Sequence, residues 1–502
     1  MKKLLLILTV GLYSAFTATA QTTVDAYRYS SEELSGTARY QAMSGAFGAL
    51  GGDLSALSVN PAGSAVFLNS FASFTASRRS SENEVGYFNQ YNSNENSDYN
   101  FSQAGGVLVF NGNNDGNWRK FTLGVNYTET NNFDDNFIAS GVNSRSIDNY
   151  FLGYAEGVPL DLLETVEDES VADLYSYLGE NYGYGEQQAL LGYQGYIINP
   201  VSNELENTSY TSAIAGNTFN QRYSFASTGL NGKLSFNFAT QYQDFLYLGI
   251  NLNSHFLNYD SSSIFTESNN NTGSETNYVN FQNRLSTTGD GFSLQVGAIA
   301  KVGEMLRIGA AYESPTWYNI REEAAQSLET DNATEGTSII NPGIVNVYPD
   351  YTLQTPGKLT GSAAVLFETR GLVSFDYSYK DYTTMEFRPE NDIDFEIQNR
   401  NIEDNFRAAS SYRLGGEYRF NNLSLRAGYR FEESPYANET TVGELTGYSG
   451  GLGYNFGTVK LDLAYSRAEY STATPLFNVG LTDAPEIDRN LSNFVLSLSF
   501  GL

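Results

Sequence analysis

Segments in which apolar and polar residues alternate recur along most of the chain. From Val373 to Tyr379 every second residue is apolar or aromatic, and the residues between them are Ser374, Asp376 and Ser378. In an extended strand this spacing puts the two kinds of side chain on opposite faces. The pattern returns at 423–431, 459–467 and 494–502. An apolar outer face and a polar inner face predict an all-β fold, a transmembrane antiparallel barrel.

The alternation predicts about fourteen strands, an even number as in bacterial outer-membrane barrels. The expected ranges are 66–78, 103–110, 119–129, 222–240, 245–257, 292–302, 306–314, 358–368, 372–381, 412–420, 423–431, 447–456, 459–467 and 493–502.

The predicted connections alternate between short and long. Short connections fall at 111–118, 241–244, 303–305, 369–371, 421–422 and 457–458, and long ones at 79–102, 130–221, 258–291, 315–357, 382–411, 432–446 and 468–492. Barrels of this kind have short periplasmic turns and long outer loops, so both termini are expected on the periplasmic side.

The first twenty residues have the features of a secretory signal peptide. Lys2 and Lys3 precede the apolar run 4–10, and small residues at 18–20 fit a cleavage site, so Gln21 is the expected first residue of the mature chain. No later stretch has the roughly 20 apolar residues of a spanning helix. Export without a helical anchor leaves the periplasm, the exterior or the outer membrane, and the barrel pattern favours a Gram-negative-type outer membrane.

Composition removes several classes of function. The chain of 502 residues has 37 Tyr and 32 Phe, which suits strands and the aromatic girdles of a barrel. It has no Cys, so disulfides and thiolate metal sites are excluded. Its formal charge of −29 makes nucleic acid an unsuitable partner. The acidity is interpreted as solvated outer loops.

The predicted wall and its loops span 66–502. Two regions are not wall strands: the segment 21–65 before the wall and the largest loop, 130–221. The segment 21–65 is too short to fold alone, and its leucines are suited to packing in a lumen, so we predict an N-terminal hatch. A disordered periplasmic tail is the alternative. The largest loop, 130–221, has apolar residues at helical spacing from Pro159 to Tyr177 and predicts a short helix with an exposed apolar face.

A series of motifs resembles the FadL-type long-chain fatty-acid transporters of the outer membrane. The hatch match is Ala38 to Phe47, Asp53 and then Asn60-Pro61-Ala62-Gly63. Further matches lie at 289–292, 306–315, 406–407, 412–415 and 426–435. The resemblance covers most of the chain except 130–221.

The resemblance implies a fourteen-stranded barrel that collects a hydrophobic ligand at its outer loops and releases it sideways at a kinked third strand. Gly124 is the candidate for that kink, because glycine weakens a ladder; the alternative is an ordinary glycine in a crowded wall. Asn60, Pro61 and Ala62 are candidates for shaping the hatch or contacting ligand.

Two residues are candidates for binding the carboxylate headgroup of a fatty acid, Arg407 and His255. Arg407 stands where the resemblance places a basic residue before the tenth strand. His255, the only histidine, shares the lumen-facing parity of Asn251 and Asn253 and is either a ligand contact or a satisfied lumen residue. Arg413, Arg419, Arg426 and Arg430 share the inward face with Glu417 and are expected to pair across strands.

We therefore predict a passive transporter of hydrophobic compounds, with long-chain fatty acids as the expected cargo. Haem or aromatic hydrocarbon uptake, a general porin, and a surface receptor or adhesin remain alternatives. No enzyme, metal or cofactor is expected, because a single His and no Cys leave no catalytic or zinc motif. The expected partners are outer-membrane lipid, a hydrophobic small molecule and the barrel-assembly machinery, with the chain as a monomer.

Overall fold

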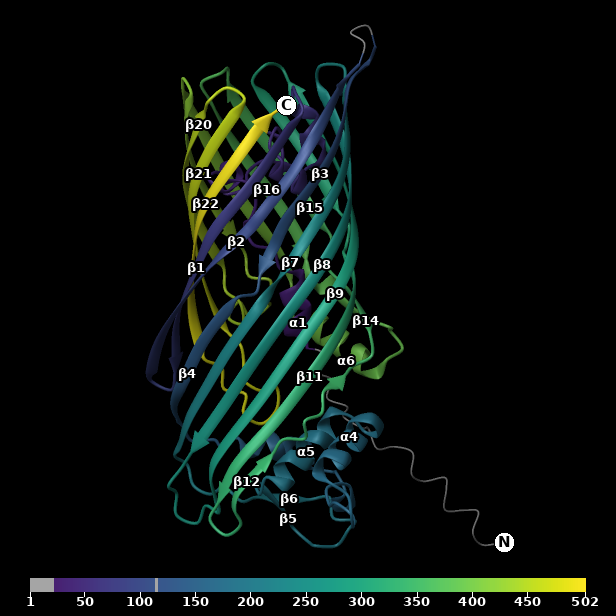
Figure 1. Ribbon diagram of the computed structural model, residues 1–502, viewed down its shortest axis with the longest axis vertical. Helices are drawn as coiled ribbons and strands as arrows, with labels where there is room; N and C mark the ends of the chain where they lie inside the picture. Colours follow the sequence, from purple (N-terminus) through teal and green to yellow (C-terminus); the bar gives the residue numbers. More distant parts are fainter. Residues whose placement is uncertain (1–21, 113–115) are drawn as a thin grey trace, which may run out of the picture.

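The computed structural model of this chain describes residues 22–112 and 116–502. It forms a closed antiparallel barrel of fourteen strand positions, in which β22 (Glu486–Gly501) pairs with β1 (Phe71–Tyr87) to complete the wall (Figure 1). Closure satisfies the backbone hydrogen-bonding groups that lipid leaves without partners. The predicted all-β barrel is confirmed, and each of the predicted strands overlaps a strand of the wall.

Beyond β1, five wall positions precede the first interrupted one, which starts at Leu306. They are β2 (Gln90–Asn111), β3 (Trp118–Asn132), β7 (Phe219–Tyr242), β8 (Leu246–Ser268) and β9 (Thr276–Val302); the interrupted position is β10 (Leu306–Glu313) continued by β11 (Trp317–Asn332). The remaining positions are β15 (Lys358–Phe367) with β14 (Tyr351–Gln354), β16 (Gly371–Asp381) with β17 (Glu386–Arg388), β18 (Ala408–Phe420), β19 (Leu423–Glu432), β20 (Leu445–Asn455), β21 (Val459–Ala473) and β22.

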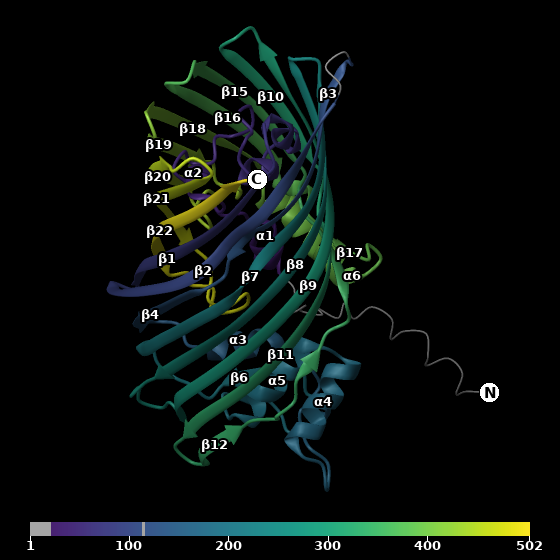
Figure 2. The same cartoon turned by 45° about the horizontal axis from the view of Figure 1, so that its top comes forward.

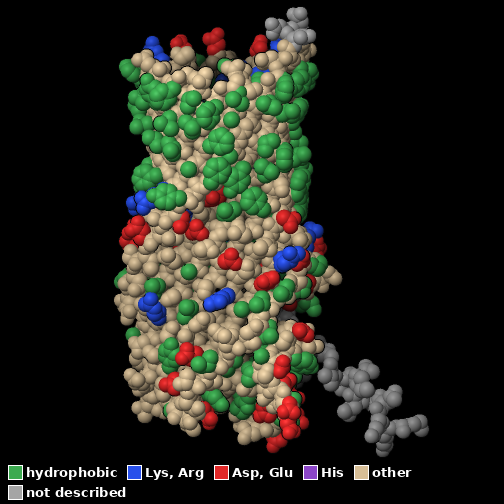
Figure 3. Space-filling model, viewed as in Figure 1, with side chains coloured by type: hydrophobic (Ala, Val, Ile, Leu, Met, Phe, Trp, Pro, Cys, Tyr) green, Lys and Arg blue, Asp and Glu red, His purple; other side chains and the backbone are tan. Residues whose placement is uncertain are grey.

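The apolar outer face covers only one half of the barrel. On β9 the outward residues Phe292, Leu294 and Val296 are exposed apolar side chains, but the same face continues with Asp290 and Arg284 toward the long loops. Figure 3 shows the apolar side chains gathered in the half that ends in short turns. The lipid-facing band therefore lies near the short turns, and the other half of the wall extends beyond it.

Two of the predicted long loops are strands. Residues 79–102 belong to the β1–β2 hairpin, whose register runs to Tyr87↔Gln90, and most of 258–291 continues β8 and β9. Beyond the lipid band both faces of a strand tolerate polar residues, so the alternation that marks a strand disappears. The barrel is consequently taller than the sequence pattern predicts.

The N-terminal segment lies inside the barrel, as the fold prediction required (Figure 2). It contains α1 (Thr23–Ser30), α2 (Ala38–Gln41) and two 3₁₀ helices, η1 (Ser55–Ser58) and η2 (Pro61–Val66). The predicted hatch is the segment 21–65; from here on the name hatch is used for residues 35–67, which contain α2, η1 and η2. The first wall strand begins at Phe71 and not at Val66, because 61–66 turns as η2.

A helical cap covers part of the long-loop end of the lumen. It consists of α3 (Asp148–Ala155), η3 (Leu160–Leu162), α4 (Val171–Asn181), α5 (Tyr184–Gln194), β5 (Ile198–Pro200) and β6 (Tyr210–Ser212). The chain enters the cap from β4 (Asp135–Asn143), which pairs with β7. Smaller elements on other loops are β12 (Gly336–Ile340), β13 (Asn346–Val347), η4 (Tyr382–Thr384) and α6 (Ile393–Asn405).

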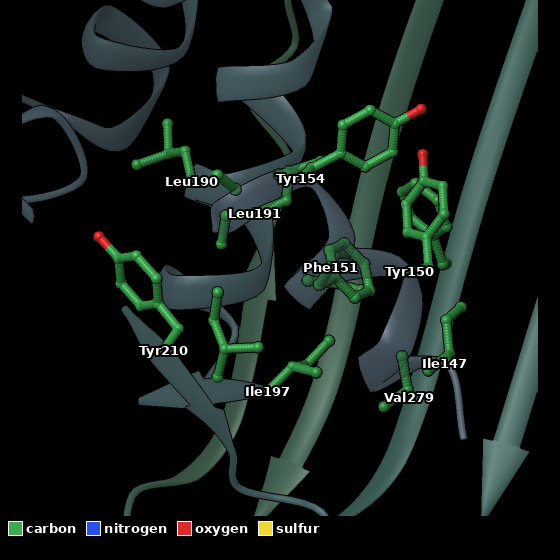
Figure 4. Close-up of a cluster of buried hydrophobic side chains, with 14 of the residues drawn as sticks. Ile147, Tyr150, Phe151, Tyr154, Leu190, Leu191, Ile197, Tyr210 and Val279 are labelled. Carbon is green, nitrogen blue, oxygen red and sulfur yellow. The ribbon is translucent and has the colours of Figure 1, made fainter. Parts of the chain in front are cut away.

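The predicted loop helix at 159–177 is wrong in its start and in its exposure. The helix begins at Val171, after the capping box of Ser170 and Asp173. Its Leu174 and Leu178 are buried in a cluster shared with α3, α5 and the ends of the wall strands. Figure 4 shows part of this cluster, including Tyr150 and Phe151 of α3 and Leu191 of α5. An apolar stripe of this size is buried by neighbouring elements when the chain supplies them.

The two ends of the chain lie in different places. Leu502 lies at the short-turn end (Figure 1). Thr22, the first described residue, lines the lumen on the long-loop side of the hatch. The predicted signal peptide at 1–20 and Gln21 lie outside the described residues. Within the described ranges, no helix combines the length and apolar character needed to cross a membrane.

Candidate ligand cavity and hatch

The Asn60-Pro61-Ala62 motif lies at the start of η2 and joins the hatch to the wall. Asn60 Nδ2 donates to the backbone oxygens of Gly48 at 2.8 Å and of Ala298 in β9 at 3.0 Å. Asn60 Oδ1 accepts from the Ala62 N–H at 3.1 Å, so the side chain also caps the turn. Pro61 occupies the first position of the turn, where its missing N–H costs no hydrogen bond.

Glycines on the inner face of the wall allow the hatch backbone to come this close. A Cβ at Gly297 of β9 would overlap Asn60 Oδ1, and one at Gly309 of β10 would overlap the carbonyl oxygen of Gly48. Four further wall glycines are equally close to hatch atoms: Gly249, Gly415, Gly428 and Gly451. The wall and the hatch are therefore fitted to each other at backbone distance.

An ion network fixes the other side of the hatch. Arg39 of α2 binds the fully buried Glu417 of β18 with Nε–Oε2 at 2.9 Å. Arg426 and Arg419 bind the same carboxylate, each at 2.6 Å. The predicted pairing of inward charges across β18 and β19 is confirmed. Because three guanidiniums share one buried carboxylate, loss of that carboxylate would leave uncompensated charge in the lumen.

A cavity of about 1990 Å³ occupies the long-loop half of the lumen. Its walls come from the segment 22–34, the cap, α6 and the loops 433–443 and 474–479. Ten tyrosines and four phenylalanines are among its lining residues. The volume exceeds the ~300–1,000 Å³ of usual small-molecule pockets. No residue of the hatch is among the described lining residues, so the cavity lies on the long-loop side of the hatch.

The cap phenols that line the cavity are neutral hydrogen-bonding groups. Tyr154 Oη donates to Asn478 Oδ1 at 3.1 Å, and the hydroxyls of Tyr150 and Tyr184 lie 2.9 Å apart. Burial raises the pKa of all three phenols above the ordinary value. The lining at this end therefore presents aromatic faces with uncharged polar edges.

His255 lies in the lumen wall, away from the large cavity. Its Nε2 is 2.9 Å from Ser293 Oγ and its Nδ1 is 3.3 Å from Tyr318 Oη, so both ring nitrogens have partners. It lines a separate cavity of about 30 Å³, next to the buried pair of Lys233 and Glu313.

Arg407, the other headgroup candidate, is also engaged elsewhere. It lies between α6 and β18, where its Nε donates to the Ser434 backbone oxygen at 3.0 Å and its Nη1 binds the Glu439 carboxylate. It is not among the lining residues of either described cavity. The structure therefore does not bring Arg407 and His255 together.

Gly124, the predicted kink position, lies within the paired part of the third strand. The ladder is regular there, with Gly124 opposite Val107 of β2 and Asn237 of β7. A Cβ on Gly124 would lie 3.4 Å from the Leu57 side chain of the hatch. This glycine therefore fits a crowded inner wall, which was the alternative interpretation of its sequence position.

The ladder of β3 with β7 shifts register at two places, between Trp118 and Lys120 and, further along than Gly124, between Glu129 and Asn131. β3 stops pairing with β2 after Thr128↔Gln103, and in the described chain no ladder joins the rest of β2 to β4. We call this boundary between 90–102 and 129–143 the seam. It is held by side chains, such as Asn92 Nδ2 donating to Ser140 Oγ at 3.1 Å. At the seam a bulge lies beside a strand edge that has no ladder partner, and such features locally interrupt a sheet.

The family assignment follows from a match over more than half of the chain. The family model described as outer membrane protein transport protein (OMPP1/FadL/TodX) matches residues 197–479. The chain belongs to this family. Members are transporters of hydrophobic compounds in the outer membrane, and the chain is accordingly a transport barrel of that class. No curated protein sequence matches it.

Solved structures of this family share the fold. A Pseudomonas aeruginosa FadL homologue is 13% identical, with a TM-score of 0.53, and the match covers 94% of this chain and 99% of that one. The Pseudomonas putida toluene transporter TodX is 14% identical, with a TM-score of 0.51 and coverage of 94% and 100%. At these identities the likeness concerns the fold alone.

Sequence reasoning missed the residues that line the cavity. Its tyrosines come from segments as distant as Tyr27 in α1, Tyr223 in β7 and Tyr470 in β21. No spacing along the chain connects them. The available signal was the high tyrosine content, which the sequence analysis attributed to interfacial girdles.

Proposed function

We propose that this protein takes up hydrophobic compounds passively through the outer membrane. The observation that carries the proposal is a large aromatic cavity that opens toward the outer loops above a hatch seated against the wall. A polar channel would need an open lumen, whereas this arrangement supports capture of an apolar molecule. Transfer from water gains roughly 0.8 kcal/mol per CH₂, so no nucleotide or other energy source is required.

The proposed exit is lateral, at the seam. The cavity is lined by residues 131–135, which adjoin the bulge of β3. On the outer face Phe101 stacks on Tyr127 at 6.2 Å where the pairing of β2 and β3 ends, as expected for an aromatic girdle at a membrane interface. Lateral release therefore belongs at residues 128–131 and not beside Gly124.

Uncharged compounds fit the cavity better than the long-chain fatty acids expected from the resemblance. A carboxylate headgroup needs a cationic partner, but Arg407 and His255 do not line the cavity. A relative with the same fold is named as a toluene transporter. We therefore favour uncharged hydrocarbons as cargo, with fatty acids as the second candidate.

Uptake by cells tests the proposal. Cells without their own transporters of this kind, with this gene added, should accumulate labelled toluene faster than cells with an empty vector. Labelled oleate in a parallel experiment compares the second cargo. Background uptake of both compounds by correctly inserted barrels would contradict the proposed function.

The exit is tested by a disulfide across the seam. Because the chain has no Cys, the two introduced thiols can pair only with each other within the chain. Asn92→Cys with Ser140→Cys should slow uptake when oxidised, and a reductant should restore it, because the seam must part for release. The control pair is Thr360→Cys with Ser378→Cys, across the continuous β15–β16 ladder. Equal uptake by both oxidised pairs would move the exit elsewhere.

A further inference from the structure

The cap carries charge of only one sign. Residues 146–221 contain twelve Asp and Glu and no Lys or Arg. Four of these carboxylates line the cavity where the cap faces it: Glu156, Asp161, Glu186 and Glu206. A cleft lined by one sign of charge concentrates ligands of the opposite sign and repels those of its own. Ligands that reach the cavity from the outer loops pass this negative region.

The interior of the cavity has the same imbalance. Its described lining contains eleven Asp and Glu but only four basic side chains, all of them Arg. Each of the four is already paired with a carboxylate: Arg28 with Asp25, Arg79 with Glu33, Arg430 with Glu432 and Arg489 with Asp135. The arginines are therefore committed to the protein, and a surplus of negative charge faces any ligand.

Some of the lining polar groups have no partner in the protein. Tyr436 is 3% exposed and lines the cavity, and its hydroxyl makes no hydrogen bond among the described residues. Ser81 Oγ and Glu186 Oε2 are likewise buried without a hydrogen bond. Buried polar atoms without partners are uncommon and require an explanation. All three can accept a hydrogen bond from a ligand.

One aromatic ring of the lining already contacts a cation of the protein. The Arg28 guanidinium carbon lies 4.5 Å from the centroid of the Tyr259 ring. Tyr436 packs beside Tyr27 at 5.6 Å and Phe406 at 4.2 Å between ring centroids, which gives a continuous aromatic surface near its hydroxyl. Ring faces attract ammonium groups, most strongly where water is excluded.

We infer that the cavity selects amphipathic cations, molecules with an apolar body and a protonated amine, over matched neutral compounds and carboxylates. This inference rests on the proposed uptake of hydrophobic compounds, and it places amphipathic cations ahead of the uncharged hydrocarbons among the ligands of the cavity. The apolar body occupies the aromatic lining, and the ammonium group donates to the unpaired acceptors among the surplus carboxylates. The negative cap favours the approach of the cation and opposes that of an ionised fatty acid.

Three probes with one apolar body test the inference. 4-Phenylbutylamine, 4-phenylbutanol and 4-phenylbutanoate are cationic, neutral and anionic at pH 7. Calorimetric titration of the purified full-length chain in nonionic detergent, corrected with protein-free micelles, should give the order amine, alcohol, carboxylate. We expect about tenfold between amine and carboxylate at low salt, and less at high salt because ions screen the cap.

Matched variants locate the effect. Glu156→Gln, Asp161→Asn and Glu186→Gln together should reduce amine affinity and leave alcohol affinity unchanged. The control combines Glu95→Gln, Glu304→Gln and Glu368→Gln, three exposed carboxylates outside the cavity lining, and should bind like the parent. Heat-dependent gel migration verifies that both variants are folded barrels.

The possible outcomes separate this inference from the proposed function. Equal affinity for amine and alcohol, tighter binding of the carboxylate, or an unchanged amine affinity in the cap variant would overturn cation selection while hydrophobic binding stands. Failure of all three probes to bind would overturn the cavity as a ligand site, and with it both proposals.

Discussion

At the scale of residues, Gly297 determines whether the hatch can pack against the wall. Asn60 occupies the space that a side chain at this position of β9 would need. The wall tolerates other residues at many inward positions, but here the neighbour is a side chain held by hydrogen bonds to two backbone oxygens. A larger residue at position 297 would therefore displace the hatch and leave the strand pairing of β9 unchanged.

Gly297→Val should displace Asn60 and raise single-channel conductance in a planar bilayer, because the hatch no longer closes the lumen. The control is Gly361→Val on β15, where a Cβ meets no atom within 4 Å. Conductance like that of the parent in Gly297→Val would show that the hatch tolerates the change or that it does not limit ion flow.

Glu417 is the second residue on which the hatch depends. Glu417→Gln keeps the shape but leaves three guanidiniums around a neutral amide, which should cost about 3–5 kcal/mol as for other broken buried pairs. The measurement is urea unfolding of the barrel in lipid vesicles. Glu469→Gln removes the exposed partner of Arg467 and should cost about 1 kcal/mol or less. Similar losses in both variants would contradict the network.

At the scale of elements, the cap is a packed subdomain and not a flexible loop. Phe477, from the loop between β21 and β22, lies against Tyr150 of α3 and Phe265 of β8, at 4.9 and 5.3 Å between ring centroids. Three separate parts of the chain thus share one aromatic cluster. The position of the cap over the cavity follows from this packing.

Phe477→Ala should lower the stability of the cap by about 3–5 kcal/mol, the usual cost of truncating a buried phenylalanine. Limited proteolysis should then cut within 146–216 earlier than in the parent, with the wall strands intact. Phe456→Ala, at a side chain that is 65% exposed in a short turn, serves as the control. Unchanged cleavage would mean that α3–α5 hold the cap without this contact.

At the scale of the whole molecule, the height of the barrel is divided between lipid and water. The division predicts opposite results for one substitution at two outward positions of β9. Val296→Arg, inside the apolar band, should cost about 2–4 kcal/mol near mid-bilayer and impair insertion. Ser286→Arg should be tolerated, because it lies beyond the band opposite Asp260 and Glu323. Heat-dependent gel migration after refolding into vesicles measures insertion; equal yields would contradict the position of the band.

The sequence by itself determined the wall near the short turns and the presence of a hatch. There each strand faces lipid on one side, so residues such as Val373 and Asp376 must alternate, and the requirement is visible in one dimension. The Asn60-Pro61 turn was likewise predictable, because its chemistry is local.

Only the tertiary structure decided the seam, the cap and the cavity. The ladder of β3 continues through Gly124 and shifts register after Glu129, shortly before β4 takes over the pairing with β7. The cavity brings together Tyr27, Tyr436 and Glu186 from three distant segments. Beyond the lipid band neither face of a strand is forced to be apolar, so the chain pattern no longer reports which side chains meet.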